Sequence, residues 1–295
     1  MEIAMKPASF EHYAPETLAE AVALLQKLED DGVDAKILAG GQSLMPMLSL
    51  RMARPEALVD LNRIAALKYI REEGDVIAIG AMTSKSAAED SALIKQKQPL
   101  FQRASELIAH RQIRNRGTVG GSFAHADPAA EYGAAAMALG ITMKVVGPEG
   151  ERLLTPDEFY VTFLTTSLGS SDILTELRVP KLAAGTGWSF QELCRRRGDL
   201  GICGAAVTLR KVGGKCTDVR IAIFGVNATA ARMKEAEKLV EGQLPSPELF
   251  VQAGKAAAAS VDEPIADVHA SGEFRRSLVE TFVARGLTEA LSRAS

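Results

Sequence analysis

Two glycine pairs, at residues 40–41 and 120–121, constrain the local backbone of this chain more than any other feature. Glycine has no Cβ, so its backbone adopts positive φ at little cost and its N–H groups can approach an anion closely. The first pair ends a short apolar run and precedes a glutamine and a serine, while hydroxyl residues flank the second pair within 118–122. Either pair alone is explained equally well by a tight turn. Together, about 80 residues apart, they favour two loops that hold a phosphate group from both sides.

Neither glycine segment matches the common nucleotide-binding motifs. A P-loop carries Gly-Lys-Ser or Gly-Lys-Thr after its first glycine, and a Rossmann turn carries Gly-x-Gly-x-x-Gly. Both patterns are absent from these segments. The formal net charge of −3 over 295 residues also gives no electrostatic reason to expect a polyanionic partner, which argues against nucleic acid as the ligand.

The cysteine pattern argues against a metal site carried by this chain. Cys194, Cys203 and Cys216 are separated by eight and twelve residues, which matches no zinc or iron–sulfur spacing. We therefore expect three reduced thiols and no metal ligand. Residues 1–9 lack the apolar stretch of a signal peptide, and no run approaches the roughly 18 apolar residues that span a bilayer, so we expect a cytoplasmic protein.

Hydrophobic periodicity predicts an α+β fold with a domain boundary near residue 180. Asp127 and Pro128 suggest the N-cap and first turn of a helix that ends at Gly140. Helices are expected at 14–28, 100–110, 127–140, 230–239, 247–259 and 273–291. Strands are expected at 35–38, 57–61, 67–70, 76–79, 141–146, 173–179, 188–194, 205–210 and 216–224. The last three strands, two of them joined at Gly213-Gly214, predict a small antiparallel sheet.

The run Ala39-Gly40-Gly41-Gln42-Ser43-Leu44-Met45-Pro46-Met47-Leu48 closely resembles the FAD-binding medium subunits of molybdenum-containing hydroxylases. Carbon monoxide dehydrogenase and xanthine dehydrogenase belong to that family. The segment 113–122 resembles the family's second flavin loop, and 127–131 stands where the family carries an acidic residue. The resemblance continues through 172–174 and 187–227, so it covers nearly the whole chain.

The resemblance implies a two-subdomain FAD-binding domain of the vanillyl-alcohol-oxidase type, also called PCMH type. This domain would occupy 1–179, with subdomains at about 1–56 and 57–179. A C-terminal domain with a three-stranded antiparallel sheet and helices would occupy 180–295. The strands and helices read from the residues agree with this arrangement.

The same resemblance implies which residues hold FAD. The first loop would wrap the pyrophosphate with Ile37, Leu38, Ala39, Gly40, Gly41, Gln42, Ser43 and Leu44. The second would close from the other side with Thr118, Val119, Gly120, Gly121 and Ser122. Glu131 would accept hydrogen bonds from ribityl or adenosine hydroxyls, although an acid near a helix N-terminus also suits the helix dipole. Leu174 would touch the ring system, or simply belong to a strand core.

The chain departs from its relatives near the expected flavin. Many relatives have a lysine in the segment 190–193, where this chain has Gln191 and Glu192, so Glu192 is the candidate residue at that position. Some relatives place an aromatic residue where Leu200 follows Asp199. His110 and His125 lie close to the second loop in sequence. Either a contact to the cofactor or a purely structural role would explain them. Residues 195–197 are three arginines that suit either partner docking or a solvated strand end.

The resemblance implies an electron-transfer subunit without catalytic residues of its own. Substrate would be oxidised at a molybdopterin centre on a large subunit, and electrons would cross two iron–sulfur clusters on a small subunit. FAD on this chain would pass them to an external acceptor, within a dimer of heterotrimers. A self-sufficient flavin oxidoreductase on the same fold, and a phosphate-binding scaffold without flavin, are the alternatives. The sequence leaves open both the substrate of the complex and the acceptor.

Overall fold

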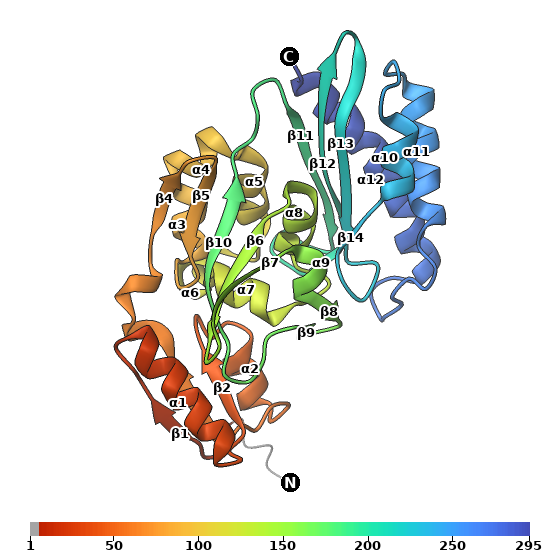
Figure 1. The fold of residues 1–295 in the computed structure, drawn as a ribbon. Coiled ribbons are helices and arrows are strands. Elements are labelled where there is room, and N and C mark those ends of the chain that lie inside the picture. The colour runs from red at the N-terminus through yellow and green to blue at the C-terminus, as the bar shows by residue number, and fades with distance from the viewer. Residues whose placement is uncertain (1–5) are drawn as a thin grey trace.

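A computed structural model describes residues 6–295 and contains three sheets of three or more strands in succession along the chain (Figure 1). The first is a parallel sheet with the order β1-β3-β2. Its covering helix, α1, begins at a capping box formed by Thr17 and Glu20 and buries Ala21, Leu25 and Leu28. The elements of this part are β1 (Glu11–Tyr13), α1 (Leu18–Asp30), β2 (Ala35–Leu38), α2 (Leu44–Ser49), β3 (Ala57–Asp60) and the 3-10 turns η1 (Leu61–Arg63) and η2 (Ala65–Leu67).

The second sheet is antiparallel, with the order β4-β5-β10-β6-β7. Its strands are β4 (Ile70–Glu73), β5 (Val76–Gly80), β6 (Thr142–Gly147), β7 (Gly150–Leu154) and β10 (Ile173–Pro180). The accompanying helices are α3 (Lys85–Asp90), α4 (Ala92–Lys97), α5 (Pro99–Leu107), α6 (Arg111–Arg116), α7 (Val119–His125), α8 (Glu131–Leu139) and α9 (Pro156–Phe159). A small hairpin, β8 (Tyr160–Thr162) and β9 (Thr165–Thr166), precedes β10.

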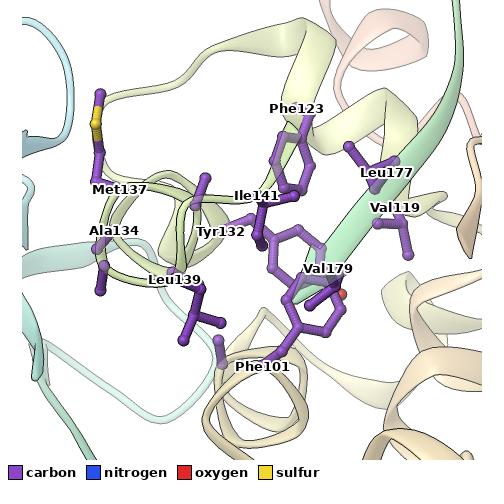
Figure 2. Packing of buried hydrophobic residues seen from close by; sticks show 14 of the residues in the cluster. Phe101, Val119, Phe123, Tyr132, Ala134, Met137, Leu139, Ile141, Leu177 and Val179 are labelled. Carbon is purple, nitrogen blue, oxygen red and sulfur yellow. The ribbon is translucent and has the colours of Figure 1, made fainter. Parts of the chain in front are cut away.

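The core of this middle part is organised by three aromatic rings (Figure 2). The Phe101 ring stacks on Tyr132 with centroids 4.8 Å apart, and Phe123 lies 5.5 Å from Tyr132 on a third element. The Tyr132 hydroxyl is buried but shares a hydrogen bond of 2.8 Å with the Ser105 hydroxyl. All nine residues of α8 are buried, because α8 lies between the second sheet and the third.

The third sheet is antiparallel, with the order β11-β12-β13-β14. It consists of β11 (Gly187–Cys194), β12 (Gly201–Val212), β13 (Lys215–Phe224) and β14 (Ala231–Arg232). The helices α10 (Lys234–Val240), α11 (Pro247–Ala259) and α12 (Gly272–Arg293) lie on one side of this sheet, whereas α8 packs on the other (Figure 1). Strand side chains alternate between these two faces, so the sheet contributes to two hydrophobic cores.

The predicted fold class is confirmed, and three local predictions were wrong. The expected strand at 67–70 is split between η2 and β4. The helix expected from residue 127 begins at Glu131, because the Asp127 carboxylate accepts the Ala129 N–H in a turn of its own. Residues 231–232 add a fourth, short edge strand to the expected three-stranded sheet, so α10 begins only at Lys234.

Strand β3 pairs in parallel with both β1 and β2 and so belongs to the first sheet. A subdomain boundary near residue 56 would separate β3 from those strands. We therefore propose a boundary between η2 and β4, near residue 68. The division expected at residue 180 falls at the last residue of β10, and we retain it as a proposal.

Throughout residues 6–295, none of the helices combines the length and the apolar character needed to cross a bilayer.

Replacing Phe101 by alanine should lower the free energy of unfolding by about 3–5 kcal/mol, because it leaves a cavity against the Tyr132 ring. Urea unfolding followed by circular dichroism measures this change. Phe274→Ala is the matched control, since Phe274 is 45% exposed. Equal losses in the two variants would contradict the central role of the ring stack.

Candidate functional site

The loop from Ala39 to Ser43, between β2 and α2, carries a run of unused backbone donors. Within residues 6–295, the N–H groups of Gly40, Gly41, Gln42, Ser43 and Leu44 reach no protein acceptor. Gly41 has a φ of 70°, in the left-handed region. A left-handed residue within such a run makes the backbone concave and gathers successive N–H groups around one point. The loop is therefore suited to an anionic group such as a pyrophosphate.

Backbone contact joins this loop to the second glycine segment. A Cβ added to Gly40 would overlap the carbonyl oxygen of Arg116 and lie 2.7 Å from the Gly117 Cα. The Asn62 side chain donates to the Ala39 carbonyl at 2.9 Å, and the Gln42 amide donates to the Gly40 carbonyl at 3.1 Å. Both bonds use carbonyl groups of the loop as acceptors and neither uses one of its N–H groups. The N–H groups therefore remain available to a ligand. Gln42 thus serves the loop's own shape in addition to any ligand contact.

The second glycine segment is the start of a helix, which corrects the expectation of a second loop of free donors. Thr118 is the N-cap of α7, and its hydroxyl accepts the Gly121 N–H at 3.0 Å. The N–H groups of Val119 and Gly120 donate to carbonyls of residues 83 and 81, both at 2.9 Å, and that of Ser122 donates to the Thr118 carbonyl. Position 120 requires glycine because a Cβ there would lie 2.5 Å from the Ala81 Cβ. The second segment therefore fixes the position of the first loop and has side-chain groups available for a ligand. The first loop has its backbone N–H groups available.

Ionisable side chains lie beside the helix start. Glu131, at the N-terminus of α8, is 5% exposed, and burial raises the pKa of its carboxyl group to about 7. Lys85 is partly buried at the start of α3, where its N–H donates to the Gly117 carbonyl at 2.8 Å. Burial lowers the pKa of the Lys85 ammonium, while the Glu131 charge acts in the opposite direction. Burial also lowers the pKa of His125, at the end of α7. An acceptor for hydroxyl groups and two potential donors therefore lie near one another.

The other candidate residues lie around this centre. Leu174 is 6% exposed within the middle core, at a β-bulge of β10, so its side chain contributes to packing. Glu192 lies near the end of β11, where burial followed by the charge of Glu131 raises the pKa of its carboxyl group to about 8. His110 lies against Gly198 in the turn after β11, and a Cβ at Gly198 would overlap its ring. Leu200 is 68% exposed, and the arginines at 195–197 are exposed and have no ion-pair partner within the described range.

A cavity of about 480 Å³ borders the second glycine segment at Asn115, Arg116 and Thr118. Its lining combines polar and apolar side chains, as small-molecule pockets commonly do. The lining residues are Asn62, Lys68, Tyr69, Ile70, Met82, Thr83, Ser84, Ala87, Asn115, Arg116 and Thr118. Sequence reasoning missed Lys85 altogether, because no local motif marks it.

Residues 6–295 contain no group of three or more His, Cys, Asp or Glu side chains placed to hold a metal ion. All three cysteines are free thiols; Cys203 and Cys216 are buried.

Comparison with known proteins gives two family matches. Residues 8–182 match the FAD-binding domain of molybdopterin dehydrogenases, and residues 188–290 match the C-terminal domain of the CO dehydrogenase flavoprotein. The chain is 40% identical over 291 residues to the carbon monoxide dehydrogenase medium chain of Hydrogenophaga pseudoflava, covering 99% of this chain and 100% of that one. It is 42% identical over 292 residues to the 6-hydroxypseudooxynicotine dehydrogenase complex subunit alpha of Paenarthrobacter nicotinovorans, covering 98% and 97%.

Solved structures agree with these matches. The fold superposes on carbon monoxide dehydrogenase from Hydrogenophaga pseudoflava lacking the Mo-pyranopterin moiety, with a TM-score of 0.94, 40% identity and coverage of 98% and 99%. Quinoline 2-oxidoreductase from Pseudomonas putida 86 gives a TM-score of 0.91 at 31% identity, again covering 98% and 99%.

Gly41→Val should weaken FAD binding at least about tenfold, because a branched residue at positive φ costs about 1–3 kcal/mol and displaces the concave run of donors. Equilibrium dialysis with FAD measures the dissociation constant. Gly32→Val is the matched control: Gly32 has a φ of 71° with nothing within 4 Å of its Cβ position. FAD affinity unchanged in Gly41→Val would refute the backbone site.

Glu131→Gln should stabilise the flavin-free protein at high pH. The folded pKa of Glu131 lies above the ordinary value of 4.5, so the folded state binds more protons between pH 4.5 and about 7. Native stability therefore falls as the pH rises through that window, and the full penalty is present above it. We expect the variant to gain on the order of 2–3 kcal/mol relative to native between pH 5 and pH 9. Urea unfolding at both pH values, with surface Glu263→Gln as control, checks this; a constant difference would contradict it.

Proposed function

This chain belongs to the FAD-binding medium subunits of molybdopterin-dependent dehydrogenases, and from that premise we propose that it carries electrons from a partner's iron–sulfur clusters through FAD to an external acceptor. The observation that carries the proposal is the run of five unpaired N–H groups at residues 40–44. Such a run neutralises the two charges of a pyrophosphate without a lysine, as backbone nests do. FAD is the cofactor of the matched family, and the donors present fit it.

Different residues around the loop would hold different parts of the cofactor. The N–H groups of 40–44 would bind the pyrophosphate, and the Ser122 hydroxyl lies on the first turn of α7, on the opposing segment. Glu131 would accept hydrogen bonds from hydroxyl groups of the cofactor, since a buried carboxyl without a charged partner in contact gains most from such donors. When bound, FAD would supply uptake of single electrons from the clusters and release of one or two electrons to the acceptor, and the chain's part would be to bind, orient and shield it.

The cysteine count and the names of the relatives support a dependence on partner subunits. Three cysteines are one fewer than the four thiolates that hold a common iron–sulfur cluster. Relatives are named as medium chains, or as subunits of dehydrogenase complexes. We propose a large molybdopterin subunit and a small iron–sulfur subunit as partners, with substrate oxidised on the large one. Whether two such heterotrimers associate is measured by the mass of the purified complex.

A self-sufficient flavin oxidoreductase is the alternative. Such an enzyme would need an acid or base above the flavin together with a substrate pocket of its own. The polar groups closest to the glycine segments are instead placed for cofactor binding, and this favours the electron-transfer role.

The complex purified from its native source should contain FAD, molybdenum and iron in addition to this chain, and its flavin should bleach on addition of the complex's substrate. The isolated chain loaded with FAD should bleach with dithionite only. Absorbance near the flavin bands follows both reactions. An isolated chain that reduces its FAD with the same substrate would establish the self-sufficient enzyme instead.

A further inference from the structure

The cavity of about 480 Å³ beside the second glycine segment has two positive side chains in its lining and no acidic one. They are Lys68, directly after η2, and Arg116, the last residue of α6. Within residues 6–295, the Arg116 guanidinium and the Asn115 amide reach no protein partner. The Lys68 ammonium donates one bond, at 2.6 Å, to the Asn62 carbonyl, out of the three that an ammonium can form. Several donors that face one cavity are therefore unused.

Two carboxylates are bonded to lining residues, and each is directed to partners other than the two cations. Asp60 accepts the backbone N–H of Asn62 at 2.8 Å and its side-chain amide at 2.7 Å. Glu176 accepts the Tyr69 hydroxyl at 2.6 Å. The whole chain has a formal net charge of −3, so the positive charge of the lining is a local excess. A cleft lined by charge of one sign concentrates ions of the opposite sign, and this cleft should attract anions.

The rest of the lining gives the cavity an apolar wall. Ile70 of β4 and the buried Met82 contribute aliphatic surface. The Tyr69 ring is held in place, because its hydroxyl is bonded to Glu176 and the Arg71 guanidinium lies 4.3 Å from its centroid. A volume of about 480 Å³ is in the range of small-molecule pockets and leaves room for more than an inorganic ion. The lining therefore suits a molecule with an anionic end and an apolar body.

The cavity adjoins the first glycine loop but does not include it. None of residues 39–44 lines the cavity, and neither do Ser122 and Glu131. Thr118 is the one lining residue that was also expected to hold FAD. The contacts to the first loop use the Asn62 amide and the Arg116 carbonyl, and they leave the Arg116 guanidinium free. The unpaired cations thus belong to a different group of donors from the N–H groups of 40–44.

We propose that this cavity is a second anion site, separate from the site of the FAD pyrophosphate, and that it binds a small organic anion with an apolar body, such as a phosphate monoester. The Arg116 guanidinium would bind two oxygens of the anion, as its planar fork of donors allows, and Lys68 would bind another. The apolar body would lie against Ile70 and Met82. This inference goes beyond the proposed function and does not require FAD to be bound.

Isothermal titration calorimetry tests the site, with phenyl phosphate as the probe and the full chain loaded with FAD as the receptor. We expect one molecule bound per chain, at least about tenfold more tightly than inorganic phosphate, because the ring buries apolar surface. Benzyl alcohol has a similar ring without the charge and should also bind at least about tenfold more weakly. An affinity for phenyl phosphate no higher than for either comparison compound would overturn the proposal.

Flavin absorbance in the filtrate, measured as phenyl phosphate is added, separates this cavity from the cofactor site. FAD should stay bound, because no residue of the first loop lines the cavity. Release of FAD in proportion to the phenyl phosphate bound would place both ligands in one site and overturn the second site, while the proposed function would stand. A chain that binds phenyl phosphate but no FAD would overturn the proposed function alone.

Variants of the two cations test which groups recognise the anion. Arg116→Gln and Lys68→Gln should each weaken binding of phenyl phosphate about tenfold, because each removes a charged donor. Arg195→Gln is the matched control, since Arg195 is also exposed and unpaired within the described residues but lies outside the cavity lining, and it should keep the native affinity. Native affinity in both cavity variants, or an equal loss in Arg195→Gln, would overturn the proposal. The titrations of the native chain decide the question even if a variant fails to fold.

Discussion

The close approach of two backbones at Gly40 is the constraint on which the site depends. The loop after β2 and the turn before α7 meet where any side chain at position 40 would overlap the Arg116 carbonyl. This contact joins the first sheet to the helices of the second, because residue 40 follows β2 and residue 116 ends α6. The first loop, whose N–H groups we propose to bind the pyrophosphate, therefore lies directly against the backbone that leads into α7.

The two glycine segments look alike in sequence but perform different tasks. The first needs glycine at position 41 for a φ of 70°, and so turns its N–H groups toward a ligand. The second needs glycine at position 120 because α7 begins in contact with the Ala81 backbone, and the N–H groups of residues 119–121 donate to carbonyls just after β5 and to the Thr118 hydroxyl. Similar local composition thus reflects a loop with unused N–H groups in one case and close packing in the other.

The sequence predicted elements whose signals are local, and it failed where distant backbone decided the outcome. The first glycine loop, the helix end at Gly140 and the turn at Gly213-Gly214 were predictable because positive φ demands particular residues. The partners of the Val119 and Gly120 N–H groups lie more than 30 residues earlier, so no local pattern reveals them. Asp127 and Pro128 resembled a helix start, but the chain turns at left-handed Ala126 and the Asp127 carboxylate is used before α8 begins. Lys85 joins the site only through the fold.

The position of Glu192 illustrates how one residue can change the charge on the face of a strand without changing the backbone that carries it. Strand alternation fixes the direction of the residue whatever its charge, since Phe190 and the α5 and α8 helices fix the strand. A lysine at position 192 would attract the Glu131 carboxylate because the two charges are opposite. Glu192 instead repels it, because both groups are carboxylates. Two like charges that are close together in a low dielectric cannot both ionise cheaply, so one of them retains a proton at neutral pH. The fold thereby places an acid with a raised pKa on the α8 side of β11, about 150 residues after the first glycine loop in the chain.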